Sequence, residues 1–211
     1  MRKVKHLSAV LLVLVLLAAL LPHDALSSAA PVPMLGSIDE STYWNDQLSI
    51  GFELAGSDWF FYTEDEILEI NQLTGDMLGD DFQKALDSLD SYTDMFAANS
   101  VTGENVNITV ENLSGLNALL TSEKSYMQVG AKGLEEALKQ MGVEDFVCSS
   151  EDFTIGGETH PGSRVSYTLQ GVSLYQAVVV IKSDSRMLTI TATSLQSDTC
   201  DSILEGFFRS K

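Results

Sequence analysis

Basic residues are scarce in this sequence. The 211 residues include 12 Lys plus Arg against 30 Asp plus Glu, a formal net charge of −18. Nucleic acids, anionic membranes and wall polymers would be repelled at long range by so acidic a protein. We therefore expect no nucleic-acid partner, whereas a basic protein or divalent cations would be attracted. The simplest alternative is that the charge only keeps the protein dispersed in solution.

Histidine is almost absent outside the N-terminal segment. His6 and His23 lie in that segment, so a Ser-His-Asp or Cys-His arrangement in the mature chain would have to use His160. His160 stands among the glycines and proline of residues 156–162, a pattern typical of a loop, and we expect it to face solvent. The Gly-x-Ser-x-Gly nucleophile elbow and a phosphate-binding loop are also missing. We therefore predict no catalytic residues and no cofactor.

Cysteine is limited to Cys148 and Cys200. In an oxidising compartment such a pair can form one disulfide that closes a long loop, a constraint worth about 3–5 kcal/mol. The alternative is two separate buried thiols, because Cys200 begins an apolar helical stripe and Cys148 lies in a strand-like run over residues 146–155. The sequence leaves both possibilities open. Two cysteines so far apart are a weak metal signal.

A single long apolar run is present, at the N-terminus. Arg2, Lys3 and Lys5 precede residues 9–21, which are short for a membrane span and typical of a signal peptide. We predict a signal peptide over residues 1–29, with an uncleaved anchor as the alternative. The mature chain would keep 9 of the 12 basic and 29 of the 30 acidic residues, a net charge of −20. It would be secreted, without a stable membrane anchor, and we expect a monomer.

Residues 93–142 carry the clearest structural pattern. Alternation of apolar and polar residues over 106–110 predicts a half-buried strand, entered from an apolar run at 94–99. Ser122 is a plausible helix N-cap, and Gly142 stands where a C-cap belongs. Apolar residues between them fall on one helical face, and Gly130, Gly133 and Ala137 on or beside that stripe would let the helix lie close to a sheet.

The remaining patterns predict one domain over residues 43–211, after a flexible linker at 30–42. Strands are expected at 48–54 and 59–62, then a helix capped by Thr63 and Glu66 that runs toward Gly79, and a short helix at 81–89. Four further strands follow the long helix, and a last helix runs to Arg209. Short turns join successive strands, so we predict an α+β fold: an α/β/α sandwich whose mainly antiparallel sheet of six to eight strands is covered by helices.

The order of these elements resembles the Mog1/PsbP-like family, in particular its small secreted bacterial members. The matching features span residues 48–208: Ile50-Gly51-Phe52 with Trp59, Asp94-Met95-Phe96-Ala97 leading into Asn105-Val106-Asn107-Ile108, Gly156-Gly157, and Tyr175-Gln176. The resemblance rests on core spacing and carries no chemical signature. It implies a protein that acts through protein contacts.

Acidic residues are densest at 80–94, where Asp87, Asp90 and Asp94 are weak candidates for metal ligands. Most proteins use such a cluster as a solvated face, and the Asp-x-Asp-x-Asp-Gly loop that binds calcium tightly is absent. We predict no metal site, with loose divalent-cation binding as an alternative. A hydrolase that uses carboxylates alone is a second alternative, since the sequence contains many of them.

Aromatic residues crowd the N-terminal strands. Phe60, Phe61 and Tyr62 are consecutive in a strand and cannot all point to one face of a sheet, so an uncovered aromatic there would be a candidate partner surface. Taken together, the sequence favours a non-catalytic extracytoplasmic binding or assembly module, whose protein partner the sequence does not identify.

Overall fold

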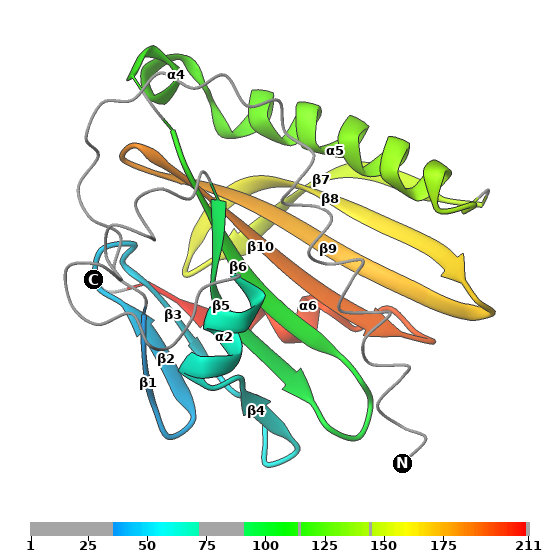
Figure 1. The fold of residues 1–211 in the computed structure, drawn as a ribbon, viewed down its shortest axis with the longest axis horizontal. Helices are drawn as coiled ribbons and strands as arrows, with labels where there is room; N and C mark the ends of the chain where they lie inside the picture. Colours follow the sequence, from blue (N-terminus) through cyan, green and yellow to red (C-terminus); the bar gives the residue numbers. More distant parts are fainter. Residues whose placement is uncertain (1–35, 72–90, 114, 144, 210–211) are drawn as a thin grey trace.

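A computed structural model describes residues 36–71, 91–113, 115–143 and 145–209 of the chain. Its largest element is a seven-stranded antiparallel sheet in the order β4-β5-β6-β10-β9-β8-β7 (Figure 1). The strands are β4 (Trp59–Phe61), β5 (Ser91–Asn99), β6 (Asn105–Asn112), β7 (Val147–Ile155), β8 (Glu158–Leu169), β9 (Val172–Ser183) and β10 (Arg186–Leu195). The α+β class and a mainly antiparallel sheet within the expected range of strands are confirmed.

Two layers cover this sheet. Helix α5 (Glu123–Gln140) lies across one face, over β8 and β9 (Figure 1). On the opposite face, helix α6 (Cys200–Leu204) packs with a second sheet in the order β1-β2-β3-β11. The strands of that sheet are β1 (Ser37–Asp39), β2 (Thr42–Asn45), β3 (Ile50–Glu53) and β11 (Phe207–Phe208). The covering layers therefore contain a small sheet in addition to helices.

Helix α5 follows the sequence pattern closely. The Ser122 side chain caps its N-terminus by accepting a hydrogen bond from the Ser125 N–H, and Gly142 follows its end with a φ of +81°. Met127, Leu134 and Leu138, spaced by about two turns and one turn, are buried against the sheet. Because its apolar stripe is covered, α5 is stabilised mainly by packing on β8 and β9.

The central strands divide their side chains between the two faces. Every second residue of β6 and β10 points into the core between the two sheets: Val106, Ile108, Val110, Leu188, Ile190 and Ala192, all fully buried. The β6–β10 register sets these residues directly opposite one another, for example Ile190 and Ile108. The intervening residues face the α5 side of the sheet.

Three expected boundaries differ from the observed ones. Residues 36–42, expected as linker, include β1 and the start of β2, which pair with each other. The last helix ends at Leu204 and does not reach Arg209. A Cβ on Gly206 would lie 2.7 Å from the Glu53 carbonyl oxygen, so this glycine lets the chain approach β3, where Phe207 pairs with Phe52.

Helix α2 (Glu64–Ile70) has the predicted capping box and ends at Asn71, before the expected end near Gly79. Residues 72–90, including the helix expected at 81–89, are outside the described part.

Helix α4 (Gly115–Leu120) was not expected from the sequence. Its position is tied to the sheet by Lys182, whose Nζ donates hydrogen bonds to the carbonyl oxygens of Ala118 (2.6 Å) and Thr121 (2.7 Å). Within the described residues, none of the helices has the length and apolar character needed to span a bilayer.

A buried carboxylate joins the two sheets. Asp94 is the extra residue at a β-bulge between Thr93 and Met95, and only 4% of it is exposed. Its oxygens accept hydrogen bonds from the Gly36 N–H (2.9 Å), the Asn45 amide (2.8 Å) and the Tyr43 hydroxyl. Burial raises the pKa of Asp94, and these donors act in the opposite direction. The bulge therefore aims a polar side chain into the interface between the sheets, where the small sheet supplies its partners.

Removing the Tyr43 hydroxyl is expected to destabilise the protein, because a donor to a buried carboxylate would be lost. Tyr43→Phe should lower the free energy of unfolding in urea by about 1.5–3 kcal/mol. Tyr62→Phe, which alters a half-buried tyrosine outside this contact, is the control and should change it by less than about 0.5 kcal/mol. Equal effects of the two substitutions would contradict a stabilising role for the Tyr43–Asp94 hydrogen bond.

The raised pKa of Asp94 also predicts a pH dependence of stability. A proton held more tightly in the folded state stabilises it fully below the ordinary carboxyl pKa, and this contribution is lost as the pH rises through the folded-state pKa. The unfolding free energy of the wild type minus that of Asp94→Asn should therefore fall as the pH rises from about 4, then level off. Urea titrations of both proteins across this range would reveal it, and a difference that grows with pH would refute it.

Candidate functional site

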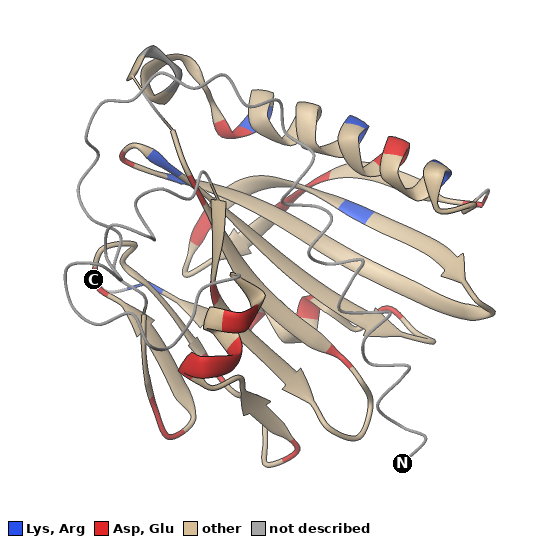
Figure 2. Ribbon diagram, viewed as in Figure 1, with Lys and Arg blue, Asp and Glu red and all other residues tan. Residues whose placement is uncertain are grey.

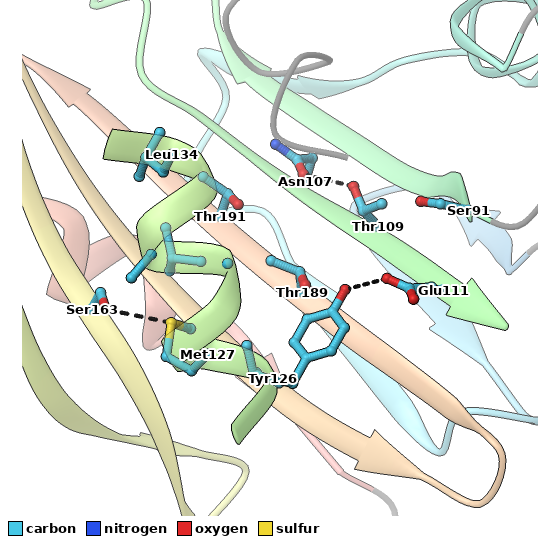
Figure 3. A pocket seen from close by; sticks show the side chains of 14 residues that line it. Ser91, Asn107, Thr109, Glu111, Tyr126, Met127, Leu134, Ser163, Thr189 and Thr191 are labelled. Atoms are coloured by element: carbon cyan, nitrogen blue, oxygen red, sulfur yellow. Dashed lines mark hydrogen bonds between the residues drawn. The ribbon is translucent and has the colours of Figure 1, made fainter. Parts of the chain in front are cut away.

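A pocket lies on the face of the large sheet that α5 covers, between that helix and strands β5, β6, β8, β9 and β10 (Figure 3). Its cavity volume is about 60 Å³. An apolar cavity of roughly 150 Å³ holds one benzene molecule, so this pocket is suited to a small group. Its walls differ in chemistry from its floor.

The floor of the pocket is neutral and polar. The β6–β10 register sets Asn107 beside Thr191 and Thr109 beside Thr189. Asn107 and Thr191 are buried, and the Thr109 hydroxyl donates a hydrogen bond to the Asn107 side-chain oxygen (3.4 Å). The full set of small polar residues in the lining is Ser91, Asn107, Thr109, Ser163, Thr189 and Thr191.

The walls of the pocket are apolar. They comprise Met127, Gly130, Ala131 and Leu134 from α5, and Val178 and Val180 from β9. A Cβ placed on Gly130 would meet no atom within 4 Å. For Gly130, the expectation of a close contact between helix and sheet is therefore wrong, because this glycine borders open space and widens the pocket.

One charged group lines the pocket, at the end next to the start of α5. The Glu111 carboxylate accepts a hydrogen bond of 2.6 Å from the Tyr126 hydroxyl (Figure 3). Burial, followed by the neighbouring Glu111, raises the pKa of Tyr126, so the hydroxyl remains protonated and keeps donating. The pocket thus combines apolar walls with neutral donors and acceptors and one engaged carboxylate. It is suited to binding an uncharged group and unfavourable to anions.

His160 is buried, which corrects the expectation of a solvent-facing loop histidine. Gly156 and Gly157, both with positive φ, form a tight turn, so β8 begins at Glu158 and includes His160. Only 6% of His160 is exposed, its Nδ1 lies 3.2 Å from Glu123 Oε1, and its Nε2 lies 3.7 Å from Glu158 Oε2.

Both partners of His160 are carboxylates, so neither contact places a serine or cysteine nucleophile against the imidazole. Glu123 Oε1 also accepts a hydrogen bond of 2.8 Å from the Lys182 N–H, and Arg209 lies 2.8 Å from Glu158. The hydroxyl of Ser163 is directed to the Met127 sulfur (3.3 Å). Through Glu123, these contacts hold the first turn of α5 against strands β8 and β9.

The metal candidates are not brought together among the residues that the structure describes. Asp94 is committed to the contact between the sheets, while Asp87 and Asp90 lie outside the described residues. The described segments contain no group of three or more His, Cys, Asp or Glu side chains that could hold a metal ion.

Both cysteines are free thiols, so the candidate Cys148–Cys200 disulfide is not formed. Cys148 packs with the cluster under α5, whereas Cys200 belongs to the core between the sheets. The large sheet separates them, which a pattern of spacings along the chain could not reveal. Burial raises the pKa of the Cys148 thiol and raises that of Cys200 to about 11, so neither is activated as a thiolate.

The pocket residues were not predicted as a site. The available signal was the polar half of two central strands: Asn107, Thr109, Thr189 and Thr191 are all neutral, although an exposed strand face commonly carries charge. Only the position of α5 over the same face shows that these residues line a pocket.

Because the space beside Gly130 is open, Gly130→Ala should stabilise the protein by about 0.5–1 kcal/mol through its higher helix propensity. Gly142→Ala is the matched control: its surroundings are equally open, but its φ of +81° disfavours alanine, and it should destabilise the protein by about 1 kcal/mol. Thermal and urea unfolding of both variants would measure these values. Destabilisation by Gly130→Ala would contradict the open pocket.

Comparisons with known proteins give no family assignment. No family model matches the sequence, and no curated protein matches it. Among solved structures, the chain is similar to LpqN of Mycobacterium tuberculosis, described as involved in cell envelope biogenesis, with a TM-score of 0.40 and 18% identity over 58% of this chain and 79% of that one. It is also similar to a protein of Bacteroides thetaiotaomicron VPI-5482, with a TM-score of 0.41 and 11% identity over 81% of this chain and 48% of that one.

Proposed function

We propose that the mature chain is an extracytoplasmic, non-catalytic binding or assembly module, and that the pocket beside α5 receives an uncharged side chain of a partner protein. The N-terminal sequence pattern supports a location outside the cytosol. We also propose membership of the Mog1/PsbP-like family, supported by core spacing along residues 48–208.

The pocket is the observation that carries the proposal. Compared with the roughly 150 Å³ cavity that holds one benzene molecule, its volume of about 60 Å³ suits a small aliphatic side chain and is well below that needed for a cofactor. Met127, Leu134 and Val178 offer apolar contacts to such a side chain, and the floor of Asn107 and Thr191 offers hydrogen bonds to a neighbouring polar group. Pockets that accept one anchoring side chain are common at the centres of protein interfaces.

Carboxylate-dependent hydrolysis is less well supported at this pocket. Glycoside hydrolysis requires a pair of carboxyl groups that flank the bond to be broken. Of the residues that line the pocket, Glu111 alone carries a carboxylate, and the Tyr126 hydroxyl already occupies it. The pocket's chemistry therefore favours binding.

Filling the pocket tests the proposal. Gly130→Leu places an isobutyl group in the open space beside α5, and Val129→Leu is the control, because Val129 is 51% exposed on the same helix. Both variants and the wild type would be immobilised and exposed to envelope and culture-supernatant extracts of the producing cells. A protein retained by the wild type and by Val129→Leu should be lost from Gly130→Leu.

The affinity of the recovered protein gives the quantitative result. Titration calorimetry should show binding to Gly130→Leu at least about tenfold weaker than to the wild type, as expected when an anchor pocket is blocked. Circular dichroism would verify that the variant is folded. Equal retention by all three proteins would refute the role of the pocket, and no retained protein at micromolar concentrations would refute the binding function.

A further inference from the structure

A stack of aromatic side chains lies exposed at the edge of the large sheet. Phe60 in β4 is 42% exposed and stacks on Tyr62, with ring centroids 5.8 Å apart and planes inclined by 9°. Tyr62 in turn contacts the buried ring of Phe96 at 4.6 Å. The neighbours of Phe60 in the strand, Trp59 and Phe61, point the other way and join the core. The stack therefore packs against the buried Phe96 ring at its Tyr62 end and is exposed to solvent at Phe60.

The segment that carries the stack is acidic. Residues 36–71 contain nine Asp or Glu and no Lys, Arg or His. Thr63, the N-cap of α2, follows Tyr62, and the first turn of the helix exposes Glu64, Asp65 and Glu66, which makes this helix prominently acidic in Figure 2. We call Phe60, Tyr62 and these three acidic residues the acidic–aromatic surface.

One carboxylate of this surface, that of Glu66, is held in place by hydrogen bonds at the start of α2. The Thr63 N–H donates a hydrogen bond of 2.8 Å to Glu66 Oε2, and the Glu66 N–H donates one of 3.4 Å to the Thr63 hydroxyl. Burial, followed by the nearby Glu66 charge, raises the pKa of Tyr62. The capping box therefore fixes a negative charge that acts on Tyr62, the half-buried member of the aromatic pair.

We propose that the acidic–aromatic surface docks an arginine-bearing segment of a basic protein. A guanidinium group stacks on an aromatic ring and pairs with carboxylates at the same time, because it is planar and carries several N–H donors. An anionic group would be repelled here, and an apolar one would leave the carboxylates without a counter-charge. This inference is independent of the pocket beside α5, which lies on other residues.

The protein contains the same combination of groups elsewhere on its own surface. The Arg164 guanidinium lies 5.4 Å from the centre of the Phe153 ring and makes ion pairs with Glu151 (2.8 Å), Asp198 (2.8 Å) and Asp201 (2.6 Å). On the acidic–aromatic surface the ring and the carboxylates are present, and within residues 36–71 the chain supplies no basic residue. A second copy is an unsuitable source, since each copy carries a formal net charge of −18.

The test uses a short glycine-spaced arginine peptide as the probe and the same peptide with citrulline as the uncharged reference. Binding to the full-length mature protein would be measured by titration calorimetry at physiological salt. Phe60→Ala removes the exposed ring, and Glu66→Gln removes the charge while keeping the capping hydrogen bond. Glu136→Gln and Leu119→Ala alter an exposed acid and an exposed apolar residue elsewhere and serve as controls.

We expect saturable binding of the arginine peptide, with little binding of the citrulline peptide. Phe60→Ala and Glu66→Gln should each weaken it by about threefold to fivefold, the range for an exposed cation–π contact, and the controls should leave it unchanged. Equal weakening by Glu136→Gln would show diffuse attraction to an acidic protein and overturn the proposal. Unchanged binding to Phe60→Ala would also overturn it, as would a dimer in sedimentation equilibrium that Phe60→Ala dissociates.

Discussion

The alternation of side chains along β6 and β10 is the constraint on which the rest of the domain depends. These strands lie at the centre of the large sheet, with a covering layer on each face. Ile108 and Ile190 fill the core between the two sheets, and the residues between them face α5. Four of those residues, Asn107, Thr109, Thr189 and Thr191, have short side chains and leave space under the helix. A slip of one residue in the register would move the apolar set under α5 and remove both the core and the pocket.

Local patterns predicted the elements that local physics determines. Ser122 and Gly142 mark the ends of α5 because capping involves only neighbouring residues, and the Thr63–Glu66 capping box starts α2 for the same reason. The α+β class followed from the period of the apolar residues. The alternation over 106–110 located β6 correctly, although its polar residues line a pocket and are not simply exposed.

Features set by distant contacts could not be obtained in this way. His160 is buried because a two-residue turn extends β8 and because Glu123, 37 residues away, reaches it from α5. Cys148 is half-buried and Cys200 is buried, and only the topology shows that a sheet separates them. The segment before β2 reads as a linker by composition, but the Asp94 carboxylate anchors it through the Gly36 N–H.

The order of the large sheet has a consequence for how the protein behaves when concentrated. Its two outer strands are β4, which has three residues, and β7, whose central positions are the exposed Glu151 and Asp152. The short strand β4 offers few backbone groups for pairing with another copy. Two copies of β7 paired edge to edge would bring their carboxylates together. Both outer strands of the large sheet therefore disfavour its growth into fibres when the protein is concentrated.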